Sequence, residues 1–235
     1  MTWLQTCSNG PTDRAFDLMK PDWRDVDFEV AIPEALARQS RYTGHIRGGV
    51  YSIAQHCVIG ADAIWRKHRD RDAAAAFLLH DAHKFVLGDK ATPIAEAECE
   101  TAEQLQPGAG KIVRAMQKLM KHRIDVAIYA AAGLGNDGCP ERFRRMVAEY
   151  DIGLLATERA HMLGPAPKPW HPTVEAAEPV RMLGRIRPWP WHQAADEYRD
   201  RLRKYLPDRF GGVTANPPSK SGPRRDGARR QLEEA

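Results

Sequence analysis

The sequence predicts an all-α fold, and three observations lead to it. Apolar residues recur at helical spacing in one segment after another, and no strand-like alternation lasts more than a few residues. No internal repeat is visible. Apolar residues make up 43% of the 235 residues, enough for a sizeable core. We therefore expect a single helical domain over residues 1–207, followed by a basic tail over 208–235 whose Gly, Pro, Ser and Arg content favours disorder.

The expected helices follow one another along the whole domain. Pro33 suits the first turn of a short helix, and Ser52 with Gln55 forms a capping-box pattern at the start of the next. Gly133 offers a stop for a long helix, and a Pro- and Trp-rich connection over 164–191 follows the helix after it. Helical patterns cover residues 33–39, a segment beginning at 52, and 72–84, 94–104, 111–132, 140–163 and 193–206.

Composition narrows the classes of function. The net charge is +4, half of it in the tail, so the domain has no broad basic field and we expect no specific nucleic-acid partner. No run of eighteen apolar residues appears, so we expect no membrane span. The N-terminus lacks the basic and apolar regions of a signal peptide, and the four cysteines form no CxxC pair. These features favour a cytoplasmic protein with reduced thiols.

Ionisable residues stand at helix positions where an apolar residue is expected. A buried carboxylate is costly unless it is paired or binds a metal. Two imidazoles and two carboxylates from separate helices would satisfy one another around a divalent cation with mixed nitrogen and oxygen ligands. Satisfied core histidines, with the aspartate of the 140–163 helix paired to Arg144 or Arg145, remain the competing interpretation. The residues concerned are His56, His80, Asp81 and Asp151.

The flanking sequences carry a family resemblance. The segments YSIAQHCVIGA, AFLLHDAHKFVLGDKATPI and AEYDIGLLATE place the four residues in an H…HD…D order. This pattern resembles the HD-domain metal-dependent phosphohydrolase superfamily, and within it the bacterial 5'-deoxynucleotidase branch and phage deoxynucleotide phosphohydrolases. The resemblance implies a helical HD-domain fold and one divalent metal, whether Co, Mn, Fe, Zn or Mg. Its ligands would be His56, His80, Asp81 and Asp151.

The resemblance also implies roles for residues around the metal. Arg41 and Tyr42 match a pair that helps to bind the nucleotide, which suits bidentate contacts to phosphate and packing on a base or sugar. His45 fits a further substrate contact, and Asp89 matches an acidic residue near the sugar and phosphate. Lys84 departs from the pattern, because nucleotidase relatives carry a glutamate for proton transfer there, and an ammonium group is a poor base. It could still draw in phosphate or donate a proton, so Lys84 and Asp89 are the candidate catalytic residues.

Weaker candidates surround these residues. His83 is an alternative to Lys84 for a role in the site. Glu158, seven residues after Asp151, could orient a ligand histidine, although a structural hydrogen bond is the simpler interpretation. We expect the tryptophans of the 164–191 connection to pack onto the helices and not to clamp a ligand; they are Trp170, Trp189 and Trp191.

The expected function is hydrolysis of a nucleotide phosphate ester. Deoxynucleoside 5'-monophosphates are the leading substrates, and removal of triphosphate from a dNTP is the second enzymatic reading. A degenerate HD protein that binds a nucleotide without turnover is the alternative from another class, motivated by Lys84. The expected partner is a small-molecule nucleotide, and a homodimer stays open.

Overall fold

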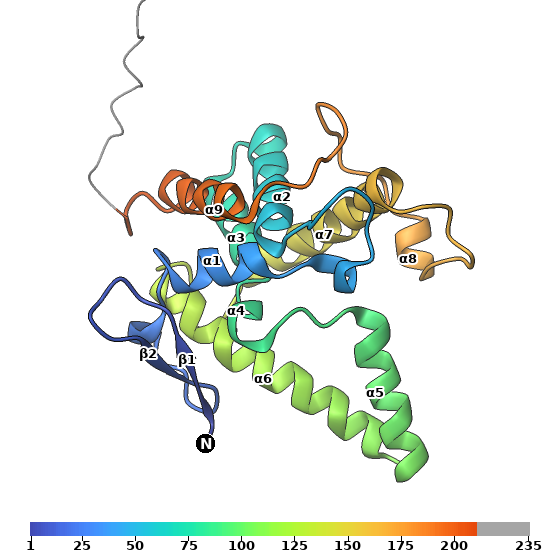
Figure 1. The fold of residues 1–235 in the computed structure, drawn as a ribbon, viewed down its shortest axis with the longest axis horizontal. Coiled ribbons are helices and arrows are strands. Elements are labelled where there is room, and N and C mark those ends of the chain that lie inside the picture. The colour runs from blue at the N-terminus through green and yellow to red at the C-terminus, as the bar shows by residue number, and fades with distance from the viewer. Residues whose placement is uncertain (211–235) are drawn as a thin grey trace, which may run out of the picture.

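The computed structural model describes residues 1–210 as a bundle of helices beside a short N-terminal β-hairpin (Figure 1). The all-α prediction is confirmed at this level. Of the predicted tail over 208–235, all but the first three residues lie outside the described part of the chain. In chain order the elements are β1 Trp3–Thr6, β2 Arg14–Asp17, η1 Trp23–Asp25, α1 Ala31–Arg38, η2 Arg41–Gly44, α2 Ile53–His68, α3 Arg71–Leu79, α4 Lys84–Leu87, α5 Thr92–Leu105, α6 Ala109–Ala131, α7 Glu141–Met162, α8 Pro172–Glu175 and α9 Trp191–Tyr205.

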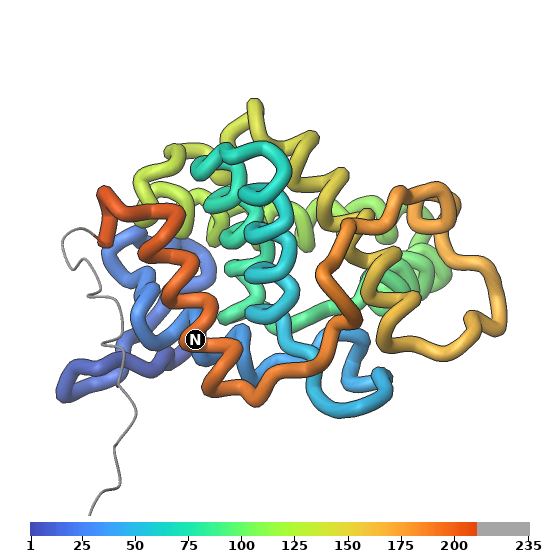
Figure 2. The backbone as a smooth tube through the Cα atoms, turned by 90° about the horizontal axis from the view of Figure 1, so that it is seen from above, coloured from blue at the N-terminus to red at the C-terminus, as the bar shows by residue number. Residues whose placement is uncertain are grey.

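The centre of the molecule is the pair α2 and α3 (Figure 2). Nearly all of α2 from Ile53 to Ile64 is buried, and α3 is buried from Ala73 to its end. Gly60 allows the two helices to touch, because a Cβ at this position would lie 2.0 Å from Cε1 of Phe77. Helices α1, α7 and α9 pack around this pair and complete the core.

The N-terminus of α2 is capped by a side chain and tied to the 164–191 connection. The Ser52 hydroxyl caps the helix by accepting from the backbone N–H of Gln55, as predicted. The reciprocal half of the capping box is absent, because the Gln55 amide reaches the 164–191 connection. Its Nε2 donates to the Arg187 carbonyl at 2.8 Å and its Oε1 accepts from the Trp189 N–H at 2.9 Å. The first turn of α2 is therefore held from outside the helix.

Two expectations about secondary structure were wrong. The predicted helix over 72–84 ends at Leu79, and a turn over 80–83 separates it from α4. The reason is local: the His80 ring takes the Phe77 carbonyl as its partner at 2.6 Å, a side-chain bond that competes with the helix. The 164–191 connection is not wholly irregular either, because Pro172 opens the one-turn helix α8.

The β-hairpin was not predicted. Strands β1 and β2 pair antiparallel, with Leu4 opposite Phe16. Phe16 is fully buried and meets the edge of the Phe85 ring, with 5.0 Å between ring centroids, so the hairpin is joined to α4.

Helices α5 and α6 pack mainly against each other. They form a hairpin that extends away from the core (Figure 1). Across residues 1–210, no helix combines the length and the apolar character that crossing a bilayer would require.

Candidate metal centre

Three elements bring His56, His80 and Asp151 together. His56 lies on α2, His80 in the turn after α3, and Asp151 on α7. One potential ligand atom from each lies within 4.8 Å of the others. Asp151 Oδ1 is 3.2 Å from His56 Nε2 and 3.7 Å from His80 Nε2. The three residues could hold a metal ion, as the sequence analysis predicted for them.

The protonation pattern of the two imidazoles suits metal ligands. Nδ1 of His56 lies 2.6 Å from a Glu158 carboxylate oxygen, and Nδ1 of His80 lies 2.6 Å from the Phe77 carbonyl. Because these partners accept hydrogen bonds, each Nδ1 must carry the proton and each Nε2 offers a lone pair. Both Nε2 atoms are buried and make no hydrogen bond within the described residues. Imidazoles fixed through one nitrogen with the other left free are typical of metal sites.

Asp81 lies beside this cluster. It is buried, and its Oδ2 is 3.5 Å from His80 Nε2. The same oxygen also lies 2.9 Å from Lys84 Nζ and 3.4 Å from Arg41 Nη1. Its carboxylate is thus shared with two cations and stands outside the three-residue cluster. A role for Asp81 as the fourth ligand stays a prediction.

The cluster favours positive charge. Burial alone would raise the pKa of Asp81 and Asp151, but the neighbouring histidines and, for Asp81, Lys84 lower both pKa values. Both carboxylates are therefore ionised at neutral pH. Against the opposing effect of burial, Asp81 and Asp151 raise the pKa of His80. A divalent cation would take the place of the proton on such a histidine.

Glu158 supports the cluster from behind. It is fully buried on α7, and besides His56 it accepts from the Tyr51 hydroxyl at 2.7 Å and from the Tyr42 hydroxyl. Arg41 Nη2 lies 3.2 Å from its second oxygen. Burial opposes ionisation, but Arg41 and His56 lower the pKa of Glu158 to about 2. Sequence reasoning gave Glu158 a minor place and missed Tyr51, whose only signal is its position next to the Ser52 cap.

The predicted substrate pair lies at the edge of the cluster. The Arg41 guanidinium is buried between Asp81 and Glu158, next to the candidate metal ligands. Tyr42 and Thr43 adopt left-handed backbone conformations, with φ of 56° and 54°, which are uncommon for residues other than glycine. The Tyr42 ring faces Trp170 at 6.4 Å between centroids.

Of the other predicted site residues, some lie next to the cluster and some do not. Lys84 Nζ bridges Asp81 and Asp89, with 2.7 Å to Asp89 Oδ1, so both predicted catalytic side chains lie next to the cluster. His83 points to α6, where its Nδ1 is 3.2 Å from Asp125. His45 is exposed, and among the described residues no hydrogen bond or ion pair joins its ring to the cluster.

The surroundings of the cluster include one open face. The Asp151 side chain is 42% exposed, whereas His56 is fully enclosed, so access is through the α7 side. A surface hollow of about 800 Å³ lies between α2, α7 and residues 173–181, and Tyr150 and Ile152 line it, but the three cluster residues do not.

As predicted for the tryptophans, Trp189 packs against the core; Trp170 stacks with Arg159, and Trp191 with Arg38.

Known proteins add little to this picture. No family model matches the chain. The chain is similar to an uncharacterized protein of Rhodobacter capsulatus, with 36% identity over 88 residues. The match covers 36% of this chain and spans less than half, 44%, of that relative.

Proposed function

We propose that the protein is a metal-dependent phosphohydrolase that acts on nucleotides, with deoxynucleoside 5'-monophosphates as its substrates. The observation that carries the proposal is the pair of buried Nε2 atoms on His56 and His80, which make no hydrogen bond within residues 1–210 and both face the Asp151 carboxylate. Two imidazole nitrogens with carboxylate oxygens suit a borderline divalent metal. When bound, such a metal polarises a phosphoryl oxygen and makes water more acidic.

The neighbouring cations suit a phosphate ester. Arg41 and Lys84 both contact Asp81, and a phosphate group would compete for the same guanidinium and ammonium donors. Asp89 holds the Lys84 ammonium in place, and its carboxylate lies beside the cluster, where it could accept a hydrogen bond from a sugar hydroxyl or take up a proton. The nucleotide as substrate class is supported by the HD-domain resemblance of the segments around His56, His80 and Asp151.

The test is a substrate and metal panel on the purified full chain. We expect inorganic phosphate from deoxynucleoside monophosphates, and loss of this activity together with bound metal in His56→Gln and Asp151→Asn. Glu149→Gln is the matched control, because Glu149 is an exposed carboxylate on α7 whose ion pair within residues 1–210 is with Arg145 and not with the cluster. Release of inorganic triphosphate from a dNTP would favour the second enzymatic reading. Equal activity in the parent and His56→Gln would contradict the proposal.

Lys84 favours a second candidate, a protein that binds nucleotide without turnover. Its ammonium group forms ion pairs with Asp81 and Asp89, at the position where a catalytic carboxylate would need to accept and donate protons. Lys84→Glu is then expected to hydrolyse a monophosphate that the parent only binds, and to bind nucleotide more weakly. Lys84→Met separates the loss of the ammonium from the gain of a carboxylate. If Lys84→Glu abolishes an activity that the parent has, lysine is a working group and the binding-only candidate is wrong.

A further inference from the structure

Trp170 is a tryptophan that lies outside the hydrophobic core. Within residues 1–210, Trp189 of the same connection packs against the core, whereas Trp170 does not, although it is partly buried. Its indole meets the ring of Tyr42, with 6.4 Å between centroids, and the guanidinium of Arg159, whose Cζ lies 5.1 Å from the indole centroid. The side chain is therefore held in place by something other than burial in the core.

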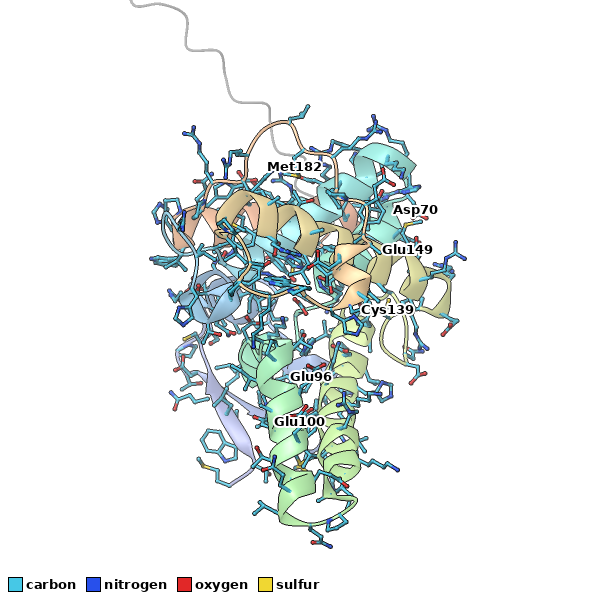
Figure 3. The ribbon with its side chains drawn as sticks, turned by 90° about the vertical axis from the view of Figure 1, so that its right-hand side faces the viewer. Asp70, Glu96, Glu100, Cys139, Glu149 and Met182 are labelled. Atoms are coloured by element: carbon cyan, nitrogen blue, oxygen red, sulfur yellow. The ribbon has the colours of Figure 1, made fainter. Side chains whose placement is uncertain are left out.

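One carboxylate fixes the position of Trp170. Glu175 Oε1, on α8, accepts from the backbone N–H of Trp170 at 2.7 Å and from Nη1 of Arg159, on α7, at 2.6 Å. The Arg159 guanidinium in turn lies over the indole. Helix α8 packs against α7 on the side of the molecule that faces the viewer in Figure 3. An aromatic ring that is already positioned in the free protein has little ordering cost when it binds a ligand.

The ring that Trp170 meets belongs to the candidate centre. The Tyr42 hydroxyl donates to one oxygen of Glu158, and the other oxygen of Glu158 lies 2.6 Å from His56 Nδ1. Two side chains, Tyr42 and Glu158, therefore connect Trp170 to a candidate metal ligand. Tyr42 and Thr43 have left-handed backbone conformations, and such conformations in residues other than glycine are concentrated at sites that hold ligands.

Tyr42 also connects the indole to the candidate phosphate donors. The Cζ atom of Arg41 lies 5.6 Å from the centroid of the Tyr42 ring. A nucleotide whose phosphate contacts Arg41 would carry its base beyond the sugar, past Tyr42. Every nucleobase has a π-face on which an aromatic side chain can stack, and a sugar phosphate has none. Since the Tyr42 and Trp170 rings are tilted by 47° to each other, the base would lie against the indole and not between two parallel rings.

We propose that Trp170, with Tyr42 beside it, binds the base of the nucleotide substrate. The site then selects nucleotides over phosphate esters that lack a base. This inference rests on the proposed function, and it names the side chain that recognises the part of the substrate farthest from the phosphate.

Equilibrium binding to the full chain tests the proposal with two ligands that cannot be hydrolysed. They are the 5'-methylenephosphonates of deoxyadenosine and of 2-deoxyribose, and the second lacks the base. In Trp170→Ala we expect the affinity for the deoxyadenosine ligand, measured by calorimetry, to fall at least about tenfold, and the affinity for the deoxyribose ligand to stay unchanged. Trp23→Ala is the matched control, because Trp23 also has an arginine Cζ 5.1 Å from its ring but lies on η1, which packs mainly on α6 and β2.

Fluorescence separates contact with the base from an effect on folding. In the parent, the deoxyadenosine ligand should quench tryptophan emission and the deoxyribose ligand should not. Trp170→Phe keeps an aromatic face, so it should bind the deoxyadenosine ligand nearly as well as the parent and lose this quenching.

The possible failures point to different errors. Equal affinity for the deoxyadenosine ligand in the parent and in Trp170→Ala would overturn the inference and leave the proposed function standing. An equal loss of affinity for both ligands would also overturn it, because Trp170 would then only support the surrounding connection. A parent that binds metal but neither ligand would overturn the inference and the proposed function together.

Discussion

Glu158 is the single residue on which most of the candidate centre depends. Its carboxylate meets His56, Tyr51, Tyr42 and Arg41, which all lie within residues 41–56, about a hundred residues before it in the sequence. A buried carboxylate with this many donors is fully satisfied, and it fixes the proton of His56 on Nδ1. The orientation of His56, a candidate ligand, is thus set by a residue outside the three-residue cluster.

Replacement of this carboxylate should weaken metal binding without removing a ligand. In Glu158→Gln we expect the metal affinity to fall about 10–100-fold, because the imidazole loses a charged acceptor behind it. The measurement is competition with a chromophoric chelator. Tyr51→Phe is the control, since it removes one donor to Glu158 and leaves the His56 bond in place. An unchanged affinity in Glu158→Gln, with a parent that binds metal, would limit Glu158 to a structural role.

At the scale of elements, α9 is joined to α2 by one acidic side chain. Asp62 on α2 accepts from Arg201, whose Nη2 lies 2.8 Å away, and from the Tyr205 hydroxyl. Burial favours the neutral acid, but these bonds outweigh it and hold the pKa of Asp62 below its ordinary value of 3.8. The folded state therefore gains stability from Asp62 above that value and loses it as the pH falls through the lowered pKa.

Asp62→Asn should show this dependence on pH. We expect the variant to be less stable than the parent by roughly 1–3 kcal/mol at pH 7, the range for hydrogen bonds to charged groups. The difference should shrink below about pH 4, where the unfolded parent begins to bind a proton. Urea unfolding at both pH values measures it. Asp200→Asn, an exposed carboxylate on α9, should cost little at either pH.

At the scale of the whole molecule, a metal at the cluster would add a direct link between three parts of the chain. Its ligands lie on α2, in the turn after α3 and on α7. With metal at a hundred times its dissociation constant, the folded state gains about 2.7 kcal/mol, so chelation should lower the melting temperature by about 5–10 °C. His56→Gln should not respond to the chelator. A parent that melts at the same temperature with and without chelator would count against the site.

The helices were predictable where their periodicity was long. The patterns over 140–163 and 193–206 correspond to α7 and α9 because many turns repeat the same apolar face, and the helix-favouring composition over 111–132 corresponds to α6. The hairpin of β1 and β2 escaped notice, since four-residue strands contain too few alternations to detect. The break after Leu79 is invisible in the pattern, because it depends on a bond from the His80 ring to a carbonyl.

The cluster itself was partly predictable. His56, His80 and Asp151 stood out as ionisable residues on otherwise apolar helix faces, and the fold brings them together. The network behind them was not, because Tyr42 and Glu158 are 116 residues apart in sequence and no local pattern links them. The same holds for Lys84, whose two partners become evident only when the turn after α3 is folded.

The contrast between α2 and α5 has a consequence for how the molecule opens. Amide protons of α2 between Ile53 and Ile64 lie in the core, so their exchange with deuterated solvent should require global unfolding. Those of α5, with only Cys99 buried, should exchange through local fraying that leaves the core intact. We expect mass spectrometry to find α5 labelled orders of magnitude sooner than α2 in dilute protein. Labelling of α5 that is as slow as that of α2 at every concentration would show that the chain opens as one unit.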